Sequence, residues 1–137
     1  MNPAISATTL EKRFTSGNTS AQVLFGVSVE LTAGELTLVS GPSGSGKSTL
    51  LAALSGLTRP DAGHVTALGQ DLWQLRPAAL DAFRLQHCGF IFQGFNLFPA
   101  LNAEDQVVLP LQYQGVKPAE ARQRARDTLA AVGLAAR

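Results

Sequence analysis

Apolar and polar residues alternate along the first part of the chain, as they do in half-exposed strands. Residues 21–32 carry apolar side chains at alternate positions near their end, and residues 4–10 are also predicted to be extended. The intervening TSGNTS is rich in residues that form turns. We therefore expect antiparallel strands ahead of about residue 34.

From residue 35 onward the pattern changes to strands that alternate with helices. Residues 35–40 are predicted to form the strand that enters a glycine-rich segment, and residues 88–93 are an apolar run typical of a buried parallel strand. A short strand is expected at 64–68, and helices at 47–56, 75–86, 102–113 and from 118 onward. This order indicates an α/β fold with an extra antiparallel β portion before the glycine-rich segment.

The last two predicted helices have recognisable starts. Asn102 followed by Asp105 is typical of an N-cap with an acidic residue in the first turn, and Pro118 suits a first helical position. The final helix has an apolar stripe formed by Ala121, Ala125, Leu129 and Val132. We expect its three arginines, Arg122, Arg124 and Arg126, to lie on a solvated face rather than to bind a ligand.

Composition narrows the class of protein. The 137 residues are 45% hydrophobic and 15% charged, which suits one globular domain. The net charge is +1 with no run of like charges, so no nucleic-acid partner is expected. One cysteine, Cys88, excludes an internal disulfide and favours a reducing compartment. We see neither a signal peptide nor a membrane-spanning stretch, and expect a soluble, cytoplasmic chain.

The glycine-rich segment carries the clearest chemistry. Residues 41–48, GPSGSGKS, match the phosphate-binding pattern G-x-x-x-x-G-K-[ST]. Glycines let backbone N–H groups approach a phosphate, Lys47 adds a positive charge, and the Ser48 hydroxyl can ligate Mg²⁺. An accidental match in an ordinary turn is disfavoured because a strand is predicted before it and a helix after it. The predicted nucleotide ligands are Gly41, Pro42, Ser43, Gly44, Ser45, Gly46, Lys47, Ser48 and Thr49.

With some forty residues ahead of this P-loop, the chain resembles the ATP-binding cassette (ABC) ATPases. Those residues are similar to the family's antiparallel β-subdomain, and Phe14 matches the position of an aromatic residue that stacks on adenine; the alternative is that Phe14 packs in a small core. Gln93 directly follows an apolar run, where the family has its Q-loop glutamine. The resemblance implies that Gln93 contacts a Mg²⁺-bound water beside the nucleotide. The implied cofactors are ATP and Mg²⁺.

The residues after Gln93 imply a partner. Gly94–Pro99 corresponds to the surface that receives a transmembrane subunit in this family, and a second nucleotide-binding domain is implied as a dimer partner. The chain would then lie in the cytoplasm, on the inner face of the cell membrane. The sequence is most similar to the branch of the family that drives lipoprotein release and macrolide export. It differs in that Asn102 and Gln106 stand where related sequences usually have threonine and asparagine.

The resemblance covers essentially the whole chain, but only the first part of the family's domain. We do not find the family's L-S-G-G-Q signature, its Walker B aspartate or its catalytic glutamate. The LSGL at 54–57 lacks the second glycine and the glutamine of the signature. Neither His64 nor His87 matches the switch histidine, because both precede the Q-loop. Phosphoryl transfer to water needs an oriented water. We therefore expect these 137 residues to bind ATP weakly and not to hydrolyse it. The ending LAAVGLAAR is interpreted as a truncation.

The resulting prediction is an incomplete α/β P-loop NTPase domain of ABC type. Its parts are a β-subdomain at about 1–34, a P-loop core at about 35–93, and the Q-loop with the start of a helical subdomain at about 94–137. As a whole, the subunit would couple ATP hydrolysis to transport across a membrane. The alternatives are a non-catalytic nucleotide-binding or interaction module, a soluble ABC protein acting on ribosomes or DNA, and a nucleoside kinase. An unprotected sheet edge would make the isolated chain poorly soluble or oligomeric.

Overall fold

The computed structural model describes residues 3–135, which form two units. The first unit extends to Arg84 and the second begins at Leu85. Within residues 3–135, no helix has the length and apolar character that crossing a membrane would require.

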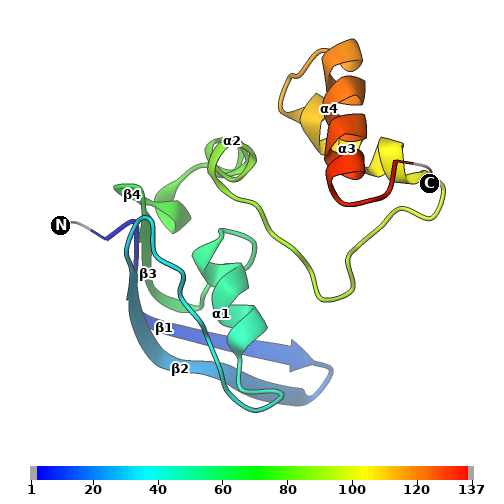
Figure 1. The fold of residues 1–137 in the computed structure, drawn as a ribbon. Coiled ribbons are helices and arrows are strands. Elements are labelled where there is room, and N and C mark those ends of the chain that lie inside the picture. The colour runs from blue at the N-terminus through cyan, green and yellow to red at the C-terminus, as the bar shows by residue number, and fades with distance from the viewer. Residues whose placement is uncertain (1–2, 136–137) are drawn as a thin grey trace. The chain divides into compact units, whose positions relative to one another are not determined.

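The first unit is built on a long antiparallel hairpin (Figure 1). Strands β1 (Ile5–Ser16) and β2 (Thr19–Leu31) are joined by a tight turn, as the sequence predicts. Strands β3 (Ala62–Ala67) and β4 (Gln70–Asp71) extend the sheet in the order β2-β1-β3-β4, with every neighbouring pair antiparallel.

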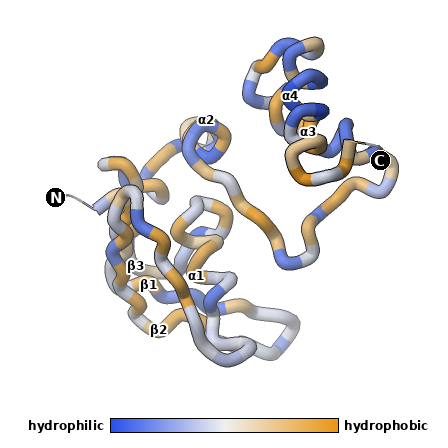
Figure 2. The backbone as a smooth tube through the Cα atoms, viewed as in Figure 1, coloured by the Kyte–Doolittle hydropathy of each residue, from blue (hydrophilic) through white to orange (hydrophobic). Residues whose placement is uncertain are grey.

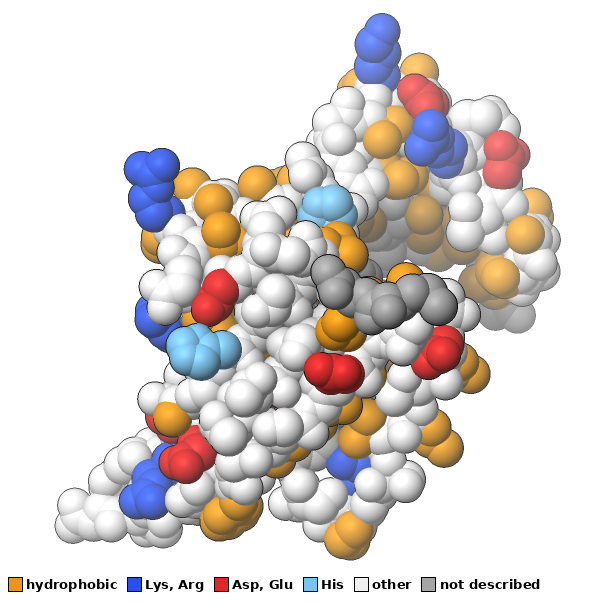
Figure 3. All heavy atoms as spheres, turned by 90° about the vertical axis from the view of Figure 1, so that its left-hand side faces the viewer, with side chains coloured by type: hydrophobic (Ala, Val, Ile, Leu, Met, Phe, Trp, Pro, Cys, Tyr) orange, Lys and Arg blue, Asp and Glu red, His pale blue; other side chains and the backbone are white. Residues whose placement is uncertain are grey.

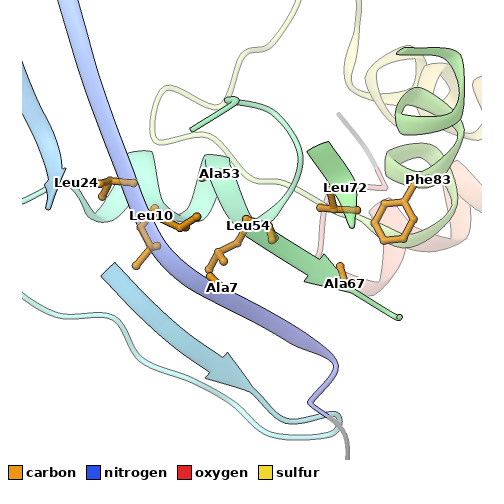
Figure 4. Packing of buried hydrophobic residues seen from close by; sticks show 10 residues of the cluster. Ala7, Leu10, Leu24, Ala53, Leu54, Ala67, Leu72 and Phe83 are labelled. Carbon is orange, nitrogen blue, oxygen red and sulfur yellow. The ribbon is translucent and has the colours of Figure 1, made fainter. Parts of the chain in front are cut away.

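Helix α1 (Lys47–Leu54) lies against one face of this sheet (Figure 1). Its buried side chains, Leu50, Ala53 and Leu54, pack together with side chains of the sheet in one apolar core. Figure 4 shows how these residues meet; the sheet supplies Ala7, Leu10, Leu24, Val65 and Ala67, and Leu72 and Phe83 complete the core. Each fully buried leucine stabilises the fold by about 1.5–3 kcal/mol, so α1 and the hairpin hold each other in place.

Leu72 and Phe83 come from two short elements that follow the sheet. The 3₁₀ helix η1 (Leu72–Gln74) begins at Asp71, whose carboxylate accepts a hydrogen bond from the Trp73 N–H at 3.1 Å. Helix α2 (Pro77–His87) confirms the helix predicted at 75–86, and Pro77 occupies its first position. It buries Phe83 in the same core.

The second unit contains helices α3 (Ala103–Tyr113) and α4 (Pro118–Ala131), joined by a short turn. Val108 packs against Ala121 and Ala125, both fully buried, in a small separate core. Both predicted helix starts are confirmed, because the Asn102 side chain accepts a hydrogen bond from the Asp105 N–H and Pro118 opens α4.

The predicted helix faces need one correction. Val132 was expected in the apolar stripe of the last helix, but it is exposed, because α4 ends at Ala131 and Val132 is its C-cap. The three arginines are exposed as predicted. They are also paired: Arg122 and Arg126 contact Glu104 of α3 at 3.0 and 3.1 Å, and Arg124 contacts Glu120 within α4.

Two of the predicted strands are wrong. Residues 35–40 and 88–93 are apolar but irregular (Figure 2), and Leu36, Leu38 and Ile91 are 100%, 87% and 88% exposed. A strand needs hydrogen bonds from a neighbouring strand, and no strand pairs with either segment within the described part of the chain. The apolar pattern indicates what these segments can bury, not the partner that would bury them.

Candidate nucleotide-binding site

The predicted phosphate loop, residues 41–48, connects an irregular segment to the first turn of α1. Gly44 and Gly46 have φ values of 78° and 91°, which side-chain-bearing residues rarely adopt. A Cβ on Gly46 would lie only 2.7 Å from the carbonyl oxygen of Val23 in β2. The second glycine of the motif therefore lets the loop pass tightly against the hairpin.

Lys47 holds the loop in a closed curve. Its Nζ donates to the carbonyl oxygens of Gly41 and Pro42, at 2.8 and 2.7 Å. The Ser45 N–H donates to Pro42 O at 3.3 Å across the same turn. The ammonium group is thus placed on the inner side of the loop by the loop's own backbone.

The N-terminus of α1 suits an anion. Its N-cap is Gly46, which makes no side-chain cap, and its first turn carries no acidic residue. Among residues 3–135, the backbone N–H groups of Gly46, Lys47 and Ser48 donate no hydrogen bond. Unpaired N–H groups, the positive end of the helix dipole and a lysine are the groups that bind phosphate. The donors present therefore fit a nucleotide's phosphates.

The hairpin beside the loop carries Phe14. Residues Arg13 and Phe14 pair with Gln22 and Ala21, whereas the preceding Lys12 pairs with Leu24, so Val23 forms a bulge in β2. This bulge presents the Val23 carbonyl to Gly46 of the loop. Phe14 is 48% exposed and pairs with Ala21, two residues before Val23 in β2. Phe14 is not among the residues of the apolar core, which contradicts the alternative that it packs in a small core.

Gln93 lies in the second unit and is exposed, in an irregular segment that follows Phe90 and Phe92, whose rings contact each other at a tilt of 53°. Its contact with a nucleotide stays a prediction. The following Gly94–Pro99 segment exposes three large apolar side chains, Phe95, Leu97 and Phe98. The Lys and Arg side chains visible in Figure 3 are scattered singly over the surface.

Two residues that the sequence analysis did not assign to a site support these segments. Asp61 accepts hydrogen bonds from the Lys12 Nζ at 3.0 Å and the Arg13 N–H at 2.6 Å. The Arg13 N–H and the Lys12 ammonium lower the pKa of the Asp61 carboxyl. These two hydrogen bonds could not be predicted from the sequence around Asp61, because their partners lie 48 and 49 residues away along the chain.

The second supporting residue is Gln106, in the second turn of α3. Its Oε1 accepts from the Phe98 N–H at 3.2 Å, and its Nε2 donates to the carbonyl oxygens of Phe98 and Leu101 at 2.6 and 3.3 Å. The side-chain amide pairs with Phe98 much as a neighbouring strand would. It fixes the backbone of the exposed apolar segment.

A glycine-rich loop closed by its own lysine, and leading into an uncapped helix, defines the P-loop class of nucleotide-binding domains. A model of the ABC transporter family matches residues 24–137 of the chain. The chain therefore belongs to the ABC transporter family, as the resemblance predicts.

Several relatives agree with this assignment. The chain is 42% identical over 128 residues to the lipoprotein-releasing system ATP-binding protein LolD of Chromohalobacter salexigens. The matched region covers 93% of this chain and 54% of that protein. It is 41% identical over 125 residues to the macrolide export ATP-binding/permease protein MacB of Acinetobacter baylyi. This match covers 91% of this chain and 19% of that protein. These two kinds of relative match the branch that the sequence predicts.

A solved structure shows the same fold. The dimeric post-hydrolysis state of the ATP-binding cassette MJ0796, bound to ADP and Pi, matches with a TM-score of 0.85 and 32% identity, over 92% of this chain and 56% of that chain. The predicted incomplete ABC-type P-loop fold is thereby confirmed. The chain spans 54% and 61% of the length of the two LolD relatives from Chromohalobacter salexigens and Geobacter metallireducens.

Proposed function

We propose that the chain forms the ATP-binding part of an ABC transporter subunit that couples ATP hydrolysis to transport. The observation that carries this proposal is the geometry of residues 41–48, with Lys47 held inside a loop whose N–H groups at the start of α1 are unpaired. At about 4 Å and an effective dielectric near 20, one such cation attracts one unit of phosphate charge by roughly 4 kcal/mol before desolvation.

The individual contacts are assigned as follows. The backbone of residues 41–47 and the Lys47 ammonium hold the phosphates, with Thr49 in the first turn behind them. The exposed Ser48 hydroxyl and the Gln93 amide oxygen hold Mg²⁺ or its water, since both are hard oxygen donors. Mg²⁺ neutralises phosphate charge when it is bound. Phe14 stacks on the adenine ring.

The partners follow from the exposed segment and from the relatives. We assign Gly94–Pro99 to contact with a transmembrane subunit, because Phe95, Leu97 and Phe98 are large, apolar and exposed. A second nucleotide-binding domain is the proposed dimer partner, as in the dimeric MJ0796 structure. The protein would lie on the cytoplasmic face of the membrane through its transmembrane partner.

Hydrolysis is assigned to the subunit and not to these 137 residues by themselves. The sequence holds donors for the phosphates and part of a metal site, but no candidate that would orient the attacking water. The isolated chain is therefore expected to bind ATP without turnover. ATPase activity of this chain that Lys47→Ala abolishes would contradict that expectation.

Replacing Lys47 tests the site. Lys47→Ala removes a charged donor to phosphate, so the affinity for ATP should fall about 10- to 100-fold. The measurement is equilibrium binding of a fluorescent ATP analogue, with unlabelled ATP as the competitor. Lys117→Ala is the matched control, because Lys117 precedes α4 and makes no side-chain cap there. Equal affinities of the two variants would refute the proposed site.

A further inference from the structure

The side chain of Lys12 is unusually buried for a lysine, at 16% exposure. Its Nζ lies 5.5 Å from the centre of the Phe14 ring, over the ring face, and 3.0 Å from Asp61 Oδ1. Residues two apart on a strand point to the same side, so Lys12 and Phe14 are neighbours on one side of β1. A cation within about 6 Å of a ring centre is attracted by the ring's electrons.

Asp61 is itself fixed on both sides. Its other carboxylate oxygen accepts from the Arg13 N–H at 2.6 Å, and its own N–H donates to Glu11 O at 2.8 Å. Asp61 is therefore attached to the β1 backbone on either side of Lys12, through its own N–H to Glu11 and through its carboxylate to Arg13. The ammonium group is held between the aspartate and the aromatic ring.

We propose that Lys12 is a positioning residue for the nucleotide base, which Asp61 holds against one face of Phe14 so that the other face stays free for a purine ring. The inference rests on the proposed function, in which Phe14 stacks on adenine. Fixing the ring before binding reduces the side-chain freedom that is lost when a base stacks on it. Lys12 acts through Phe14 and makes no contact with the nucleotide.

A direct electrostatic role is the competing account. A lysine that attracted phosphate would favour any polyphosphate, with or without a base. A lysine that positions Phe14 favours only ligands that carry a base. The two roles are separated by comparing ATP with inorganic triphosphate, which has the phosphates alone.

The experiment measures dissociation constants of ATP and inorganic triphosphate for the purified full-length protein and its variants. Lys12→Met should weaken ATP binding about two- to fivefold, the scale of an exposed cation–π contact, and leave triphosphate binding unchanged. Lys12→Arg keeps a cation over the ring and should retain ATP affinity. Lys117→Met makes the same substitution away from the site and should change neither ligand.

A second pair of variants tests whether the effect passes through the ring. Phe14→Leu should weaken ATP binding but not triphosphate binding, and adding Lys12→Met to it should weaken ATP binding no further. Asp61→Asn keeps an acceptor for the Arg13 N–H but removes the charge that holds Lys12. Asp61→Asn should therefore also weaken ATP binding and not triphosphate binding, and it replaces Lys12→Met in the test if that variant does not fold.

Three results would overturn the positioning role: an equal loss of triphosphate affinity in Lys12→Met, an unchanged ATP affinity, or a loss that adds fully to that of Phe14→Leu. Lys47→Ala in the same series reports on the proposed function separately, because it should weaken both ligands. If Lys47→Ala weakens both and Lys12→Met weakens neither, only the positioning role fails. If the unaltered protein binds neither ligand, both proposals fail.

Discussion

Gly63 shows at the residue scale why the sheet needs glycine at one position of β3. Its φ is 92°, and a Cβ there would lie 2.5 and 2.6 Å from the carbonyl oxygens of Thr8 and Thr9. Thr9 is itself at a φ of 47°, where the β1–β3 register shifts. This irregularity lets Ala7 and Leu10, three residues apart, both point into the core.

Gly63→Ala should therefore be strongly destabilising. The new methyl group meets backbone atoms that cannot rotate away, and overpacking of this kind costs about 1–3 kcal/mol beyond the strain of positive φ. The measurement is the free energy of unfolding in urea. Gly69→Ala is the control, since Gly69 has a φ of 80° but nothing within 4 Å of its Cβ position. Equal losses in the two variants would show that the close approach has no cost.

Asp61 makes the stability depend on pH. Hydrogen bonding by the Arg13 N–H and by Lys12 lowers its pKa below the ordinary value of 3.8. A carboxyl with a lowered folded-state pKa stabilises the fold fully above its unfolded value and loses that effect as pH falls through the folded value. Between about pH 5 and about pH 2, the unaltered protein should lose more stability than Asp61→Asn does. Parallel pH profiles, measured by thermal unfolding, would contradict this.

At the scale of single elements, the sequence predicted the helices better than the strands. Asn102, Pro118 and the glycine-rich loop before α1 are local signals, because a cap or a turn involves residues close in sequence. The bond between Gln106 and Phe98 is less visible, although they are only eight residues apart. A glutamine in a helix gives no indication that its amide pairs with a preceding loop.

Gln106→Glu tests this bond directly. The carboxylate can still accept from the Phe98 N–H, but it cannot donate to the Phe98 and Leu101 carbonyl oxygens and repels both, so the segment should open more often. Exchange of the Phe98 amide hydrogen should be about fivefold faster, the effect of losing roughly one hydrogen bond. Gln112→Glu places the same charge on an exposed position of α3 and should leave that exchange rate unchanged. If both variants exchange alike, the Gln106 side chain does not hold the Phe98 segment.

At the scale of the whole molecule, the antiparallel sheet could be predicted and the parallel part could not be seen. The hairpin and its third strand lie within the chain, so local alternation and turns were sufficient to find them. Residues 35–40 and 88–93 carry the apolar pattern of buried strands without partner strands among the described residues. The phosphate loop was predictable because its chemistry resides in eight consecutive residues.

Residues 41–48 are proposed to bind the phosphates of ATP. The most direct test of this proposal is a titration of the ¹⁵N-labelled protein with ATP and Mg²⁺, followed by the amide signals of individual residues. We expect the amides of Gly44, Gly46, Lys47 and Ser48 to shift most, and those of the Lys47→Ala variant to shift only at much higher ATP concentration. Unchanged loop amides alongside shifts elsewhere in the chain would contradict the proposal.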